Sequence, residues 1–240
     1  MKNSNIQYFT WTNQGEWYEK NEDSFIVLHR TIQGYDIVLM AVADGVGGLE
    51  NGDIASNTAI HELAQWFYNV SEVKHLSKDE ILCFLYNIDY LIRYKSKQLS
   101  TRMGTTLSMV LCFEGVLHIY HIGDSKICLI RDKLYLISED HTVAQRKLKK
   151  NQIPQQHEYH QLYQCLGIGK IPSIQVKQVI LKENDKIFLS TDGLFHQIDT
   201  QEIWECICKQ NLHTCGDTLI SMARTRNERD NITCLLLKYY

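Results

Sequence analysis

Residues 37–45 read IVLMAVADG, seven consecutive apolar residues that end abruptly in Asp44 and Gly45. The same pattern returns twice, where residues 118–124 read HIYHIGD and residues 186–193 read KIFLSTDG. Apolar runs of this length, rich in β-branched residues, predict buried strands. Because the chain leaves each run at an aspartate, we expect carboxylates from distant parts of the sequence to gather at one rim of a β core.

Two further aspartates fit this arrangement, since Asp23 and Asp230 each stand directly before a predicted strand. Carboxylates brought this close repel one another unless cations lie between them. Mg2+ and Mn2+ prefer oxygen ligands, which carboxylates and a glycine carbonyl supply. Asp-Gly is also the commonest hairpin turn. That alternative is weakened because glycine-rich or helical sequence, and no second strand, follows Asp44 and Asp192.

The remaining pattern predicts strands interleaved with pairs of helices. Apolar residues at helical spacing begin at Ile54, and Ser77 with Glu80 forms a predicted capping box for a second helix. We expect a third helix from Asp199 and a fourth over residues 217–224. The expected strands are residues 5–12, 24–32, 35–43, 105–113, 116–121, 127–131, 134–137, 174–181, 186–190 and 232–239. The first three are expected to form a small meander, and those within residues 105–137 an antiparallel block. Such a pattern indicates an α+β layered sandwich.

Composition narrows the classes of function. The chain has 240 residues, 44% hydrophobic and 22% charged, with a formal net charge of -3. This is typical of a globular protein and gives no basic field for nucleic acid. The first ten residues lack the apolar core of a secretory signal, and the longest apolar run is far shorter than the roughly 18 residues of a membrane span. We therefore expect a cytoplasmic protein that binds neither nucleic acid nor membrane.

The eight cysteines are scattered within apolar segments, which predicts reduced thiols instead of disulfides. The group Cys206, Cys208, His213 and Cys215 has the residue types of a zinc site. However, two thiols at Cys-x-Cys spacing on a helix point to different faces, so packed thiols are the favoured interpretation.

Eight short strings occur along the chain in a fixed order. They are NEDSF (21–25), VADGVGG (42–48) followed by GDIAS (52–56), GTT (104–106), IGDSK (122–126), DHT (140–142), CLG (165–167), LSTDGL (189–194) and RDNIT (229–233). This is the order found in type 2C protein phosphatases, and the sequence resembles that family over residues 6–239, most of all its compact bacterial members.

The resemblance implies a four-layer α-β-β-α sandwich, an α+β fold with two stacked antiparallel sheets flanked by helices. It also implies a single catalytic domain over residues 1–240. Within it we expect residues 141–173 to form a flap-like insertion, because they are polar, weakly periodic and contain both prolines of the chain. At one end of the sandwich it implies two Mg2+ or Mn2+ ions and a weaker third. Asp44 would bridge the first two ions, Asp192 and Asp230 would complete the shell of one, and the Gly45 carbonyl would bind the other.

The same resemblance gives Glu22 and Asp23 a role at the metals, largely through waters. Asp124, together with Asp192, would hold the third ion. The implied catalytic residues are therefore Asp44, Asp124 and Asp192. A hydroxide between the ions would attack phosphorus in line, and no phosphoenzyme would form.

Three positions depart from the family pattern. Tyr18 stands where most members carry a phosphate-binding arginine, Lys126 replaces another arginine, and Gln164 replaces a third. A tyrosine supplies one hydrogen bond but no charge, so we expect Tyr18 and Lys20 to be the substrate-binding residues here. His121 and His141 are interpreted as structural histidines.

These features predict a metal-dependent protein serine/threonine phosphatase that reverses a cognate Ser/Thr kinase in bacterial signalling. The expected partner is a phosphorylated protein, and the chain is expected to be a monomer. Two alternatives stay open, a phosphatase-like module that binds phosphoproteins with weak turnover, and a hydrolase of small phosphate monoesters.

Overall fold

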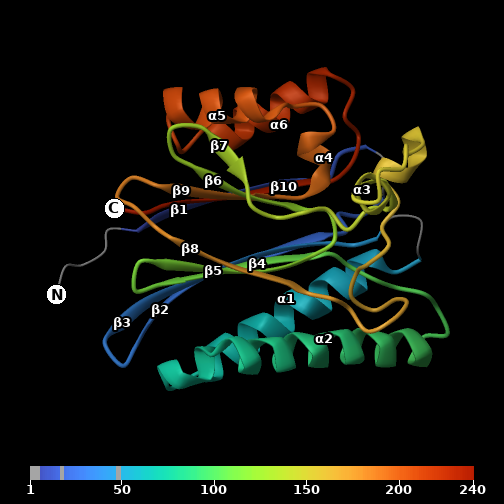
Figure 1. Ribbon diagram of the computed structural model, residues 1–240, viewed down its shortest axis with the longest axis horizontal. Helices are drawn as coiled ribbons and strands as arrows, with labels where there is room; N and C mark the ends of the chain where they lie inside the picture. The colour runs from blue at the N-terminus through green and yellow to red at the C-terminus, as the bar shows by residue number, and fades with distance from the viewer. Residues whose placement is uncertain (1–5, 17–18, 47–49) are drawn as a thin grey trace.

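The protein is layered, as the computed structural model shows for residues 6–16, 19–46 and 50–240 (Figure 1). Two five-stranded antiparallel sheets stack at the centre. Helices α1 (Gly52–Asn69) and α2 (Lys78–Gln98) cover one sheet, while α5 (Thr200–Lys209) and α6 (Cys215–Thr225) cover the other. The predicted four-layer α-β-β-α sandwich and its α+β class are confirmed.

The order of strands in the first sheet is β2-β3-β4-β5-β8, and in the second β1-β10-β9-β6-β7. The strands are β1 (Gln7–Asn13), β2 (Asp23–Ile32), β3 (Tyr35–Asp44), β4 (Leu107–Phe113), β5 (Val116–Ile122), β6 (Lys126–Ile130), β7 (Leu134–Leu136), β8 (Gln175–Ile180), β9 (Lys186–Ser190) and β10 (Ile232–Lys238).

The apolar run in β3 is continuous because both of its faces are buried. Val38, Met40 and Val42 lie in the cluster between the two sheets. Leu39 and Ala41 point the other way, into the cluster shared with α1 and α2. Successive residues of a strand face opposite sides, so a strand covered on both faces needs apolar residues at every position.

Two predicted groupings of strands are wrong. β1 does not join β2 in a meander but pairs with β10, with Gln7 opposite Lys238 and Asn13 opposite Ile232. Similarly, β6 and β7 leave the sheet of β4 and β5 and join β9. Strands β1, β6 and β7 therefore all belong to the second sheet. The local pattern of apolar residues predicts a strand but does not specify which sheet it joins.

The predicted helices are present, with one difference in capping. Ser77 caps α2 by accepting a hydrogen bond from the backbone N–H of Glu80 at 3.4 Å, but the Glu80 carboxylate contacts His75 at 2.8 Å. The box at α5 is complete, with reciprocal bonds between Asp199 and Glu202. Further short elements are α3 (Val143–Leu148), α4 (Asp192–Phe195) and the 3-10 turns η1 (Val73–Leu76) and η2 (Gln156–Tyr159).

Six cysteines are buried and two, Cys83 and Cys208, are exposed. The Cys206 thiol donates to the backbone carbonyl of Cys215 at 3.4 Å. No helix in the described ranges combines the length and apolar character needed to cross a membrane.

A close contact between α6 and β1 gives a test of the packing. A Cβ added at Gly216 would lie 2.0 Å from Cδ2 of Trp11. Gly216→Ala should therefore lower the free energy of unfolding by about 1–3 kcal/mol, measured by urea denaturation, because the indole must shift. Ser221→Ala, at an exposed position of the same helix, is the control and should change it by less than about 0.5 kcal/mol. Equal stability of the two variants would contradict the contact.

Candidate metal centre

Asp44 lies at the end of β3, where the GTT string holds its backbone. The Asp44 N–H donates to Thr106 Oγ1 at 3.0 Å, and its carbonyl accepts from Thr106 N at 2.8 Å and from Thr105 Oγ1 at 2.9 Å. Two residues further along, the Val46 N–H donates to the carbonyl of Gly104 at 2.9 Å. All these donors and acceptors are neutral, so they fix the position of Asp44 without compensating its charge.

Glu22 and Asp23 lie beside Asp44 because β2 pairs with β3. Asp23 is directly opposite Asp44 in the ladder, and Thr191 Oγ1 donates to its Oδ2 at 2.9 Å. The Glu22 N–H donates to Asn231 Oδ1 at 2.7 Å. Asp23 is thereby tied to the opposite sheet through its carboxylate, and Glu22 through its backbone.

Asp192 and Asp230 come together where β9 ends and β10 begins. Asp192 is the first residue of α4, and the following Gly193 lies so close to β10 that an added Cβ would be 2.3 Å from the Asn231 carbonyl oxygen. Only a residue without a side chain permits this approach. Asp230 is held by its own bond from the Asn231 N–H at 2.7 Å.

Asp124 follows β5 on a turn that two histidines hold. The Gly123 N–H donates to His141 Nδ1 at 3.1 Å, and the Gly123 carbonyl lies 3.1 Å from His121 Nε2. His121 Nδ1 also lies 2.8 Å from Ser108 Oγ. Both histidines have structural partners, as their sequence context predicts.

The gathered carboxylates raise one another's pKa. Burial, then repulsion from Asp23 and Asp192, raises the pKa of Asp44 well above its usual range. Burial and neighbouring aspartates raise the pKa of Asp23 to about 7. For Glu22, burial and nearby Asp53 and Asp230 raise the pKa to about 7.

Asp124 and Asp230 show the same effect. Burial and Asp192 raise the pKa of Asp124 well above normal, and raise that of Asp230 to about 6. Asp192 differs, because His196 contacts it at 3.2 Å. Burial opposes the ionisation of Asp192, but the hydrogen bond and charge of His196 outweigh it and lower the pKa of the carboxyl.

Divalent cations fit these residues. Glu22 Oε2 and Asp23 Oδ1 are buried, and within the described part of the chain neither has a hydrogen-bond donor. A buried, unpartnered carboxylate oxygen is costly, and a hard cation or its bound water would satisfy it. The gathered donors are all oxygens, which suits Mg2+ or Mn2+.

The carboxylates open onto a cavity of about 850 Å³. Four of the aspartates line its floor, and residues of the flap-like segment 141–173 line its wall. The residues that line the cavity include Asp44, Gly45, Arg102, Asp124, His160, Gln164, Asp192, His196, Glu228 and Asp230.

The end of the flap-like segment is fixed to α2. Arg93 Nε donates to Asp89 Oδ2 at 2.7 Å, and its terminal nitrogens donate to the carbonyls of Gly169 at 2.9 Å and Lys170 at 3.0 Å. Asp89 Oδ1 accepts from Gly167 N at 2.7 Å. This half-buried ion pair therefore fixes one wall of the cavity.

Comparison with known proteins agrees with this geometry. A family model described as protein phosphatase 2C matches residues 19–225. The chain belongs to the protein phosphatase 2C family. It is similar to protein phosphatase PhpP of Streptococcus pneumoniae, with 30% identity over 83% of this chain and 85% of that protein. It is also similar to the serine/threonine phosphatase stp of Listeria innocua, with 26% identity over 95% of this chain and 93% of that protein.

A solved structure also resembles the phosphatase closely. It is the catalytic domain of the serine threonine protein phosphatase PstP in complex with two manganese ions, with a TM-score of 0.81, 26% identity and 98% coverage of each chain. The predicted enzyme class, a protein serine/threonine phosphatase of the metal-dependent type 2C, is confirmed.

The basic residues of the phosphatase occupy unexpected places. Tyr18 lies outside the described residues. Lys20 forms an ion pair with Asp53 at 2.9 Å and is not among the cavity-lining residues. Lys126 is paired with Asp140 at 2.6 Å, so its charge is already compensated.

Arg102 lines the cavity but was not predicted from the sequence as a substrate-binding residue. Among the described residues that line the cavity it is the only arginine or lysine. Its place two residues before the GTT string, which binds Asp44, is the signal that would have found it.

The raised pKa values predict how the metal-free phosphatase responds to pH. Asp23 and Glu22 titrate near 7 in the folded state but near 4 when unfolded. Between these values the folded chain binds more protons, so the free energy of unfolding should fall as the pH rises from about 5 to 8. Calorimetry in chelator should show a melting temperature that falls over this range.

Added Mn2+ should remove most of this dependence of the melting temperature on pH, because the cation would replace the protons on the carboxylates. Asp44→Asn should also flatten it, whereas the exposed control Glu183→Gln should not. A melting temperature in chelator that rises between pH 5 and 8 would contradict the proposed repulsion.

Proposed function

We propose that the phosphatase hydrolyses phosphoserine and phosphothreonine esters of proteins with two divalent cations, Mg2+ or Mn2+, and a third that is held more weakly. The observation that carries this proposal is the convergence of four aspartates on the cavity floor. Beside them, Glu22 Oε2 and Asp23 Oδ1 are buried and lack a hydrogen-bond donor in the described part of the chain.

Each ligand has an assigned part. Asp44 would bridge the two inner ions, since it lies opposite Asp23 and next to Asp192. Asp192 and Asp230 would bind one ion, and the Gly45 carbonyl the other. Glu22 and Asp23 do not line the cavity and would act on the ions largely through waters. Asp124 with Asp192 would hold the third ion.

The bound cations would supply a hydroxide nucleophile and neutralise charge on the phosphoryl oxygens. Arg102 would bind the substrate from the cavity wall, because a guanidinium can donate two hydrogen bonds to a phosphate. The flap-like segment, fixed by Arg93, would position the polypeptide on either side of the phosphorylated residue.

We also assign the phosphatase a role opposite a Ser/Thr kinase. Phosphoprotein substrates are supported by relatives named as serine/threonine phosphatases. A kinase must supply such a substrate, because each cycle of hydrolysis removes its phosphoryl group. A monomeric chain with one catalytic domain over residues 1–240 would be sufficient, since the carboxylates all come from this chain.

Replacing Asp44 tests the metal centre. Asp44→Asn should lower kcat for a phosphothreonine peptide by roughly 10²-fold or more, because even outer partners of a metal site contribute 10–100-fold. Free phosphate release should require Mn2+ or Mg2+ and stop in chelator. The exposed variant Asp132→Asn is the control and should keep the native rate. Turnover that survives thorough chelation would refute the mechanism.

Replacing Arg102 tests the substrate site. A charge-assisted hydrogen bond contributes about 1.5–3 kcal/mol, so Arg102→Ala should raise KM for a phosphopeptide roughly tenfold to a hundredfold. Lys150→Ala, which removes an exposed charge outside the cavity, should leave KM unchanged. An equal effect of both substitutions would mean that only the overall charge matters. A small aryl phosphate hydrolysed better than the peptide would favour a monoester hydrolase.

A further inference from the structure

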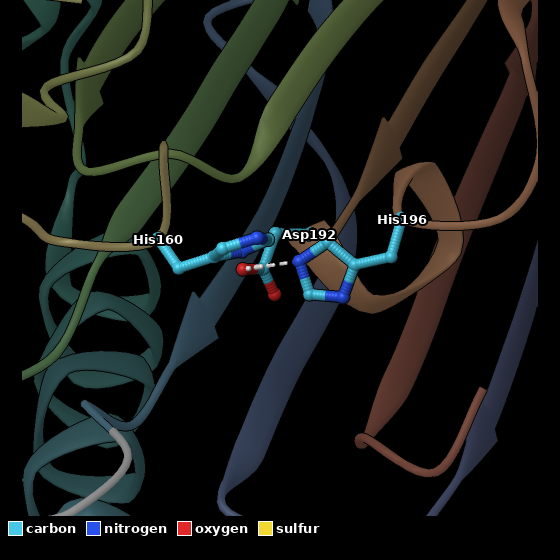
Figure 2. A group of neighbouring side chains, drawn as sticks. All are labelled: His160, Asp192 and His196. Carbon is cyan, nitrogen blue, oxygen red and sulfur yellow. Dashed lines mark ion pairs between the residues drawn. The ribbon is translucent and has the colours of Figure 1, made fainter. Parts of the chain in front are cut away.

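Two histidines converge on Asp192 at the edge of the cavity (Figure 2). Asp192 begins α4 and His196 follows its last turn, while His160 comes from the flap-like segment just after η2. One ligand atom from each of these residues lies within 4.8 Å of the other two. His196 Nε2 is 3.2 Å from Asp192 Oδ2, and the rings of His160 and His196 are 4.8 Å apart and nearly perpendicular.

A buried carboxylate orients His196 from behind. Glu228 Oε2 lies 3.3 Å from His196 Nδ1, and only 4% of the Glu228 side chain is exposed. Its Oε1 accepts hydrogen bonds from the N–H groups of Arg229 and Asp230, both at 2.9 Å. A histidine that binds a metal usually donates its other ring N–H to such a carboxylate, which fixes the tautomer and aims the free nitrogen. In this arrangement Nε2 of His196 points at Asp192.

We propose that His160, His196 and Asp192 bind one transition-metal cation of the Zn2+ type, with Glu228 as the partner that orients His196. This site goes beyond the proposed function, because the cations of catalysis would be bound by oxygen ligands alone. Two imidazoles and a carboxylate suit Zn2+, whose sites commonly have three protein ligands and one open position. Mg2+ prefers oxygen and would not compete for the imidazoles.

The shared ligand gives this site a consequence for activity. Asp192 is one of the residues proposed to hold a catalytic ion. A Zn2+ ion bound to Asp192, His160 and His196 would draw that carboxylate away from the catalytic ion or change its charge. Zn2+ should therefore inhibit the enzyme at concentrations at which Mg2+ sustains it.

The test measures zinc ligation directly on the intact protein. One equivalent of ZnCl2 is added in excess MgCl2, and the ligands are counted by X-ray absorption at the zinc edge. We expect two imidazoles on zinc in the native chain and one in His160→Ala. His157→Ala is the matched control and should keep two imidazoles, since His157 is an exposed histidine of η2, the turn that directly precedes His160.

Glu228→Gln is the second variant. Gln would keep its carbonyl oxygen on the two backbone N–H groups and turn its NH2 toward His196 Nδ1. That contact places the ring proton on Nε2 and blocks ligation, so Zn2+ affinity measured by competition with a chromophoric chelator should fall about 10–100-fold. Native affinity in this variant would overturn the role of Glu228.

Zinc bound by oxygen alone, or the same number of imidazoles in His160→Ala as in the native chain, would overturn the site. Both results are independent of phosphate release. A phosphatase assay that fails would therefore refute the proposed function without affecting this inference, and the converse also holds.

Discussion

Repulsion among carboxylates at one end of the sandwich is the constraint on which this structure depends. Asp44 ends β3, Asp192 follows β9 and Asp230 precedes β10, so the strands themselves bring the charges together. Thr106 fixes the backbone of Asp44 and Thr191 the carboxylate of Asp23, and neither neutral contact compensates the charge of the acidic residue. Folding alone therefore produces a site that is under electrostatic strain, and bound cations would relieve that strain because they would replace the protons that the raised pKa values otherwise retain.

The local elements could be predicted because their causes are local. The unbroken apolar run of β3 follows from burial on both faces, and Asp199 with Glu202 caps α5 within four residues. The pairing of β1 with β10 could not be predicted in this way. Nothing in residues 5–12 specifies which sheet the strand joins, because any apolar edge accepts a strand whose pattern alternates. The six-residue α3 was not predicted, since it is too short to show a period.

The structure brings the predicted acidic residues together because each stands at an end of an apolar strand, a signal that a single sequence carries. The places of the basic residues were not predicted, because a lysine or arginine gives no sign of its partner. Lys20 was assigned to the substrate but contacts Asp53, and Lys126 contacts Asp140. Arg102 has no such partner among the described carboxylates and reaches the cavity. Where a charge points depends on the ion pairs around it, which only the folded chain defines.

These placements change how the enzyme can bind a phosphate dianion. Because Lys126 and Lys20 are already paired, and His196 is held between Asp192 and Glu228, the positive charge available to a substrate would come from Arg102 and from bound cations. Affinity for substrate should then depend on metal occupancy more strongly than in a site that has its own arginine clamp, because a cation lost from the floor removes charge that no other side chain replaces. An additional cation at His160 and His196 would alter the same balance at Asp192. The kind of metal present would thus regulate both substrate binding and turnover through one carboxylate.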